Sequence, residues 1–577
     1  MNLYKASALL SEPARLGLPE NISMASTSGP IKLRHAISPA VWWIFSAGAL
    51  IRVVFFLLGE NNGGDALARA AMTAEWLQHP GLRLNFEPWL PMHFWLMGAI
   101  GALVRDPELG ARVLSLVLGI ASLAVLWALA RVVYGESPAT LSLLVFSLYS
   151  LHIGYSTTSS SEVPYLFFML AGLLGFFVYR SSSSWAALSA GAIALGISAG
   201  MRYEAWVCIF ALFLIILFSP SRHLAGGFWQ LRHVREVFLF GALAGAWPLF
   251  WVLYQWKALG IPLYGVTLNY SWVAQQVQSA HHSMLYNLAL PPCVILLTLT
   301  PLVVAEGLYG LALGFRQPLG REYATVLLIM AAILAYQIIS GGLLPMARYT
   351  ITVGTLLVVA SGRGLERIAQ LLPQRRQPQL RAAFVLLLVL NLGAILTLSE
   401  IRQPFSDKFS AISPRLRFPH RIEDLRQYLK PQFKPSEAIA IDDYNTEPNI
   451  IAAALGLPLV TRDNAFLASI RPLSEFPEYM KSEHPHYLIY SNEGVFRKAL
   501  PLPQDCGQPV TALKGMGFKC LFANETYRVY RVSYRKDYVR DHSKYQKALN
   551  RNNSSPTVSS SRRHPPSSPP AKPRLSR

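Results

Sequence analysis

The chain has 577 residues, of which 52% are hydrophobic and only 15% are charged, and its mean hydropathy is +0.31. Soluble domains carry about 25% charged residues, so this composition excludes an ordinary soluble protein and indicates an integral membrane protein. The formal net charge of +20 does not point to nucleic acid, because Lys and Arg fall in short loops and in the C-terminal tail rather than on one soluble face. We therefore expect no nucleic-acid partner.

The N-terminal residues 1–36 are polar and lack the apolar core of a signal peptide, so they are expected to be a cytoplasmic segment. Residues 37–400 are expected to form an all-α membrane domain, because apolar runs of about 17–25 residues cross a hydrocarbon core of about 30 Å as helices. The runs are Ser38–Leu58 and stretches near residues 111–130, 138–156, 163–179, 185–200, 204–219, 236–255, 289–313, 322–340, 349–361 and 382–400. They predict a polytopic protein with about eleven transmembrane helices.

The apolar run from His93 to Val104 is left out of this count, because a helix of that length reaches only about 20 Å. Without it, and with a cytoplasmic N-terminus, the basic loops all fall on the cytoplasmic side, as the positive-inside rule requires. These loops contain Arg131, Arg180, Arg222 to Arg235, Arg316 with Arg321, and Arg363 to Arg381. The run is therefore expected to be a juxtamembrane or re-entrant helix inside a large first extracytoplasmic loop, residues 60–110.

The same topology places residues 401–535 outside as a small α/β domain. Strands are expected at Glu437–Asp442, Pro458–Thr461, His486–Tyr490 and Tyr527–Val532, with a helix near 447–455. An extracytoplasmic position would permit a disulfide between Cys506 and Cys520. Residues 536–577 are rich in Ser, Pro, Lys and Arg and are expected to be a disordered basic tail.

Three acidic residues lie at the outer ends of predicted spans. Asp65 follows Gly63 and Gly64, Glu162 precedes one span, and Glu204 heads another. Each is compatible with a helix start, where carboxylates are favoured. Acidic residues at a membrane boundary are also scarce and are candidates for function, and their convergence on one face favours a catalytic or binding site.

Arg202 and Arg348 are predicted on the same side. Either side chain could extend to lipid headgroups, or could bind an anionic group, since guanidinium pairs with phosphate through two hydrogen bonds. The sequence has no Walker loop, no HExxH and no Asp-x-Asp in the first loop, so neither a cytosolic nucleotide donor nor a metal or other cofactor is expected.

Several short motifs occur in a recognisable order. Asp65 is followed by an aromatic and proline-rich stretch at residues 86–95 (FEPWLPMHFW), then ARVLS at 111–115, ARVVYG at 130–135, Glu162, and the pair Arg348-Tyr349. This order resembles the GT-C glycosyltransferases over the first 360 or so residues. It is most similar to the superfamily of dolichyl-phosphate-mannose-protein mannosyltransferases and bacterial aminoarabinose transferases.

The resemblance implies a membrane hexosyl- or pentosyl-transferase. The expected partners are a polyprenyl-phosphate-linked sugar donor, a lipid, glycan or protein acceptor, and membrane lipids, with inversion at the sugar on the extracytoplasmic face. Asp65 would be the general base and Glu162 the second acidic residue of the site, while Arg348 with Tyr349 would hold the lipid phosphate. Many bacterial members have Lys where this chain has Pro88, so Arg69, His93 or Arg202 would take over phosphate contacts, with Glu204 beside them.

Two other classes fit a polytopic chain. A secondary transporter of a polar or lipid-linked substrate would show internal repeats and paired broken helices, and we find no convincing repeat. A non-catalytic envelope-assembly protein would use Asp65 and Glu162 only as helix caps. Transfer activity that depends on Asp65 distinguishes the enzyme from both.

Overall fold

The computed structural model describes most of the membrane domain and parts of the C-terminal domain, namely residues 37–59, 61, 64–78, 80–82, 89–218, 231–271, 284–343, 346–400 and shorter stretches between 421 and 534. The predicted helix at 447–455, the predicted strand at 458–461 and the predicted tail lie outside the described residues.

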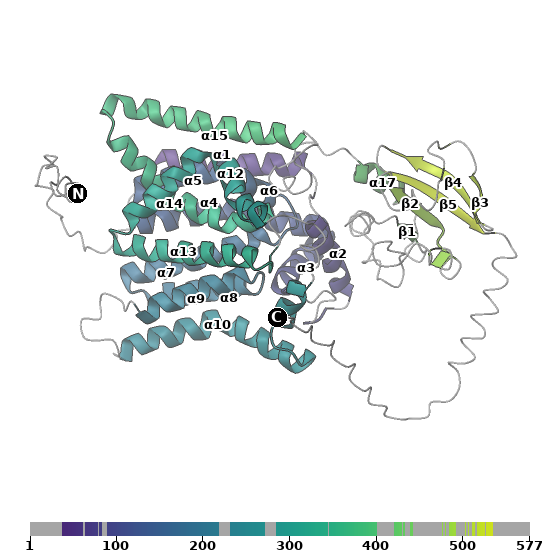
Figure 1. The fold of residues 1–577 in the computed structure, drawn as a ribbon, viewed down its shortest axis with the longest axis horizontal. Helices are drawn as coiled ribbons and strands as arrows, with labels where there is room; N and C mark the ends of the chain where they lie inside the picture. The colour runs from purple at the N-terminus through teal and green to yellow at the C-terminus, as the bar shows by residue number, and fades with distance from the viewer. Residues whose placement is uncertain are drawn as a thin grey trace, which may run out of the picture.

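The predicted apolar runs are helical over most of their length, although Thr300, inside the run 289–313, has a non-helical φ of 71°. The helices are α1 (Pro39–Leu58), α2 (Gly64–Gln78), α3 (Met92–Val104), α4 (Pro107–Tyr134), α5 (Glu136–Ser147), α6 (Ser150–Tyr155), α7 (Glu162–Ser182), α8 (Trp185–Ala199), α9 (Glu204–Phe218), α10 (Leu231–Leu259), α12 (Met284–Gly314), α13 (Pro318–Ile339), α14 (Ile351–Gln370), α15 (Gln377–Glu400) and α17 (Arg421–Leu429), with short 3-10 turns η1 (Ala347–Thr350) and η2 (Gln374–Arg376). Figure 1 shows the long helices roughly parallel in one bundle, with α10 and α15 at its edges and α2 and α3 together at one end.

The fold class is the predicted one, a multi-pass helical membrane protein with a small sheet. Among the described residues, seven helices are long and apolar enough to cross a membrane, and α3, α8 and α9 are shorter apolar helices. The total of about eleven spans and the orientation of the termini therefore stay predictions. One predicted span, 138–156, is interrupted, because α5 ends at Ser147 and α6 begins at Ser150.

Small residues allow the helices of the bundle core to pack with their backbones in contact. A Cβ atom added to Gly175 of α7 would lie 2.6 Å from the Ala187 carbonyl oxygen, at the start of α8. Small residues at such crossings are typical of helix association in membranes, where lipid is as apolar as the side chains. In contrast, α1 exposes Trp42, Trp43 and Leu50. The bundle therefore buries its glycine-rich faces and turns large apolar side chains outward, as a lipid-facing surface requires.

The C-terminal domain contains a five-stranded sheet with strand order β1-β2-β5-β4-β3. Its strands are β1 (Ile439–Ile441), β2 (Tyr487–Ser491), β3 (Val510–Leu513), β4 (Met516–Ala523) and β5 (Tyr527–Tyr534). β1 and β2 are parallel, with Ile439 opposite Tyr487, and the remaining pairs are antiparallel.

Three of the predicted strands are therefore present, whereas β3, β4 and the helix α17 were not predicted. Residues on both faces of the sheet are buried. Leu425 and Leu429 of α17 pack with Ile489 and Val529, and Leu488 and Tyr530 belong to a second cluster. Cys506 and Cys520 form a disulfide in this domain, with their Cα atoms 4.9 Å apart.

Candidate active site

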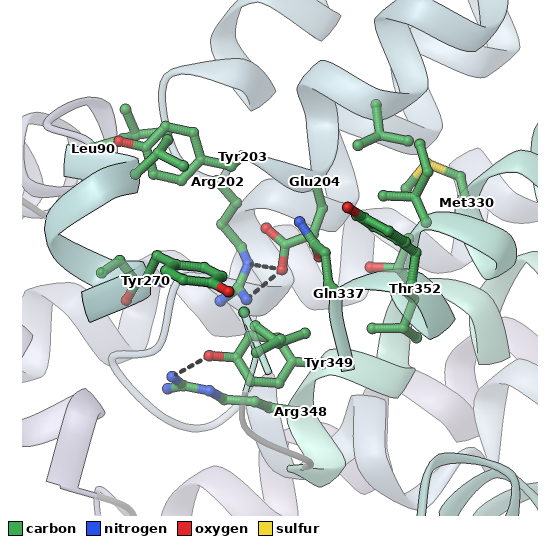
Figure 2. Close-up of a pocket in the computed structure, with 18 of the residues that line it drawn as sticks. Leu90, Arg202, Tyr203, Glu204, Tyr270, Met330, Gln337, Arg348, Tyr349 and Thr352 are labelled. Atoms are coloured by element: carbon green, nitrogen blue, oxygen red, sulfur yellow. Dashed lines mark hydrogen bonds and ion pairs between the residues drawn. The ribbon is translucent and has the colours of Figure 1, made fainter. Parts of the chain in front are cut away.

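A cavity of about 370 Å³ lies near α2 and is lined by residues from both halves of the membrane domain. Its walls come from α2, the turn between α8 and α9, residues 266–270, the end of α13, and η1 with the start of α14. In Figure 2 the side chains of Arg202, Glu204, Tyr270, Gln337 and Tyr349 point toward one another across this cavity. Segments far apart in the sequence therefore form one cavity. We call it the polar cavity after its charged side chains, although apolar residues such as Leu90 and Met330 also line it.

Asp65 and Arg348 form an ion pair that joins the first loop to η1. Arg348 Nη1 donates to Asp65 Oδ2, and Arg348 Nη2 donates to the Tyr349 hydroxyl at 2.9 Å. The two ionic side chains are 19% (Arg348) and 38% (Asp65) exposed, so solvent and ligands have access to them. Asp65 also lies in the first turn of α2, where negative charge is favoured. The Asp65 carboxylate is therefore not only a residue of the first helical turn, because it also pairs with Arg348, which lines the cavity.

Arg202 joins the starts of α7 and α9. Its Nη1 contacts Glu162 Oε1 at 2.7 Å and the Ser161 hydroxyl at 3.2 Å, while Nη2 contacts Glu204 Oε1 at 2.5 Å. Burial alone would lower the pKa of Arg202, but the carboxylates of Glu204 and Glu162 raise that pKa above its ordinary value. Arg202 is therefore a fully charged group whose hydrogen bonds are largely taken up by protein carboxylates.

Arg69 stacks on aromatic rings instead. Its guanidinium lies 4.1 Å from the Trp89 ring centroid and 5.3 Å from that of Phe94, and its Nη1 lies 3.4 Å from His93 Nδ1. Within the described residues Arg69 makes no ion pair. Burial lowers the pKa of Arg69 to about 9, which still leaves it charged at neutral pH.

His93 is buried behind Arg69 rather than in the cavity wall. Because an arginine only donates hydrogen bonds, His93 Nδ1 must accept from Arg69. Burial and the neighbouring charges of Arg69 and Arg202 lower the pKa of His93 well below its ordinary value. His93 is thus a neutral support for Arg69.

The structure brings together every residue proposed from the sequence, but not all of them line the cavity. Arg69, Arg202, Glu204, Arg348 and Tyr349 line the cavity, and Glu162 and His93 are buried behind them, while Asp65 is partly exposed and pairs with the lining residue Arg348. Sequence reasoning missed the neutral polar lining, Asn269, Tyr270 and Gln337. Nothing local marks these residues, since they lie in or beside apolar helices and only the tertiary fold turns them toward the cavity.

An apolar groove of about 190 Å³ adjoins the polar cavity. Leu334 and Val353 line both, so the two spaces are neighbours. The remaining groove residues are Leu288, Pro291, Pro292 and Ile295 of α12 and Ala331, Ala335 and Ile338 of α13. A molecule with a polar head and a long apolar chain matches this pair of spaces. Among the described residues no group of three or more His, Cys, Asp or Glu side chains could hold a metal ion.

Comparison with known proteins gives one family and several structures. The family described as dolichyl-phosphate-mannose-protein mannosyltransferase matches residues 79–246. The structure of ArnT from Cupriavidus metallidurans is similar, with a TM-score of 0.57 in the apo state and 0.55 bound to undecaprenyl phosphate. Each is 14% identical and aligns with 85% of this chain and 98% of the ArnT chain.

An oligosaccharyltransferase from Archaeoglobus fulgidus gives a TM-score of 0.47 at 11% identity, over 78% of this chain and 69% of its own. No curated protein matches this chain. The family match and the ArnT structures support the resemblance found in the sequence, and the chain has the ArnT-like GT-C fold.

Proposed function

We propose that this protein is a membrane glycosyltransferase that moves a sugar from a polyprenyl-phosphate donor to an acceptor hydroxyl on the extracytoplasmic face, with inversion. The observation that carries the proposal is the polar cavity beside an apolar groove, with Asp65 and two arginines at the polar end. A lipid-linked phosphosugar has the matching chemistry. In support, one of the two similar ArnT structures is bound to undecaprenyl phosphate.

In this mechanism Asp65 is the general base. One carboxylate oxygen is held by Arg348, and the other has no hydrogen-bond partner among the described residues. That free oxygen would accept the proton of the acceptor hydroxyl as the hydroxyl oxygen bonds to the anomeric carbon. The bond from that carbon to the phosphate oxygen breaks at the same time, and the configuration inverts.

The leaving group is polyprenyl phosphate, whose negative charge increases as the bond breaks. Arg69 and Arg348 both line the cavity and would stabilise that charge. Arg202 is less available to bind the phosphate, because it already forms ion pairs with Glu162 and Glu204. We therefore give Glu162 a positioning role: it is only 2% exposed and fixes Arg202 instead of facing the cavity.

The test uses purified protein in nanodiscs with a panel of undecaprenyl-phosphate-linked sugars, and it measures released undecaprenyl phosphate. Asp65→Asn is expected to lower turnover by about 10²–10⁴-fold, the usual contribution of a general base, with lipid-phosphate binding retained. Asp106→Asn is the matched control, because Asp106 caps α4 through the Glu108 and Leu109 amides and Asn caps equally well. Equal turnover by Asp65→Asn and wild type would remove Asp65 from the mechanism.

A further inference from the structure

A buried arginine lies at the interruption between α5 and α6. A helix break inside the membrane domain leaves carbonyl groups at the end of the first helix without their usual partners, and lipid offers no replacement. Here the last two residues of α5 are Phe146 and Ser147, and Arg52 from α1 donates to both of their carbonyl oxygens, at 3.2 and 3.3 Å. The Phe146 carbonyl also accepts from the Tyr149 amide at 3.3 Å, so Arg52 adds to one backbone contact across the break. A cation is also favoured at the negative end of a helix dipole.

Arg52 is entirely buried and connects three segments. Besides the two carbonyls of α5, its Nη1 donates to the Gly48 carbonyl at 2.9 Å and its Nη2 lies 2.8 Å from His152 Nδ1 in α6. Because arginine cannot accept, His152 must accept through Nδ1 and is therefore neutral, with its proton on Nε2. In the described part of the chain no carboxylate pairs with Arg52.

The segment held in this way leads directly to the candidate site. After α6, Ser156 donates to the His152 carbonyl at 2.6 Å. Next, Ser159 exchanges two hydrogen bonds with Asn61, at 2.7 and 2.9 Å, and donates to the carbonyl of Ala66. Ala66 follows Asp65 in α2. The loop that contains Ser159 is therefore hydrogen-bonded to the residue next to the proposed base.

The other end of the loop reaches the second ionic group. Ser161 contacts Arg202, and Glu162, the next residue, forms the 2.7 Å ion pair with Arg202. Residues 156–161 therefore connect the Asp65–Arg348 pair with the Glu162–Arg202 pair. Arg112 also holds this loop, because its Nε donates to the Thr157 carbonyl at 2.9 Å.

We propose that Arg52 is a positioning residue: by holding the break between α5 and α6, it fixes the loop 156–161 and so sets the two ionic pairs of the site relative to each other. This inference rests on the proposed function for its catalytic consequence. The proposal that Arg52 holds the break and the loop rests on the hydrogen bonds of Arg52 and does not depend on the proposed function. Arg52 does not line the cavity and does not touch substrate in this scheme.

The experiment places a cysteine in the loop and follows its reaction with a polar maleimide in nanodiscs. Ser160 is 3% exposed, so Ser160→Cys is expected to react slowly in the otherwise wild-type chain. The native Cys208 is fully buried in the bundle and reports global loosening. With Arg52→Met added, the cysteine at 160 is expected to react about 10–100-fold faster while Cys208 stays protected, because hydrogen bonds to a charged group hold the closed state.

Two variants serve as controls. Arg52→Lys keeps the charge with fewer donors and should give an intermediate rate. Arg180→Met removes another buried guanidinium, paired with Glu322 in the cytoplasmic half of the predicted topology, and should leave the cysteine at 160 protected. The proposal is overturned if Arg52→Met leaves the cysteine at 160 protected. It is also overturned if Cys208 becomes equally reactive, because Arg52 would then stabilise the whole bundle rather than this loop.

Turnover provides the second readout. In Arg52→Met the rate at saturating donor should fall at least about tenfold, while the affinity for undecaprenyl phosphate stays near the wild-type value, since positioned groups act on the transition state more than on binding. Unchanged turnover would refute the proposal. If no variant, wild type included, transfers any sugar, the proposed function fails, and the maleimide rates alone decide the role of Arg52.

Discussion

The two ion-paired arginines of the cavity should differ sharply in their contribution to stability. In Arg202→Met, the Glu162 carboxylate, whose side chain is 3% exposed, would lose its counter-charge. In Arg348→Met, the Asp65 carboxylate, 38% exposed, would remain accessible to water. The two substitutions are chemically identical and remove the same charge from the same cavity. Arg202 also pairs with Glu204, whose side chain is 27% exposed, so the main difference between the two variants is the buried carboxylate of Glu162.

The burial of each pair determines the size of the effect. Removing one partner of a buried pair costs about 3–5 kcal/mol, because the remaining charge is left without a partner. An exposed pair contributes only about 0–1 kcal/mol. Arg202→Met should therefore lower the free energy of unfolding by at least about 2 kcal/mol more than Arg348→Met. The substitution Glu162→Gln added to Arg202→Met should recover part of the loss, because no buried charge then remains unpaired.

The assay is equilibrium unfolding by SDS in mixed micelles, followed by tryptophan fluorescence, for wild type, the two single variants and the double variant. The expected order of stability is wild type close to Arg348→Met, then the double variant, then Arg202→Met. If Arg348→Met is as damaging as Arg202→Met, the Asp65 pair is a structural element. The view of Asp65 as a group free for chemistry would then be refuted.

Three further predictions concern other parts of the chain. Alkaline phosphatase fused at residue 107 should be active, and fused at residue 225 inactive, since the basic loops are predicted on the cytoplasmic side. Mass spectrometry of unreduced protein should recover Cys506 linked to Cys520, and two free thiols would contradict the structure. Gly110→Ala should destabilise the protein by about 1–3 kcal/mol in the same SDS assay, because the new Cβ would lie 2.6 Å from the Gly101 backbone at the crossing of α3 and α4.

The sequence predicted the helices well because their signal is local. A long apolar run favours a helix in lipid because the backbone must satisfy its own hydrogen bonds there, and α1 begins within one residue of the predicted position. The break at Leu148 and Tyr149 escaped prediction because the residues there are as apolar as the rest of the run, and the partner of the broken end is Arg52, distant in the sequence. In the C-terminal domain β4 was missed, because the alternation of Met516 and Phe518 with Gly517 and Lys519 is short and is lost in the apolar run from Cys520 to Ala523.

In the candidate site, too, the sequence shows the type and position of each residue but not the distant residues that it contacts. Residue type and position at the ends of predicted spans identified Arg202 and Arg348 as possible phosphate ligands, and the family resemblance added Arg69 and His93. The partners of these residues decide which of them is available. Arg202 is occupied by two carboxylates, His93 is neutral, and Arg348 is shared with Asp65 across 283 residues of sequence. Arg69 alone among these cations has only aromatic faces and a neutral imidazole as described partners. A phosphate entering the cavity would thus gain most from Arg69, which already has its charge buried and incompletely hydrogen-bonded.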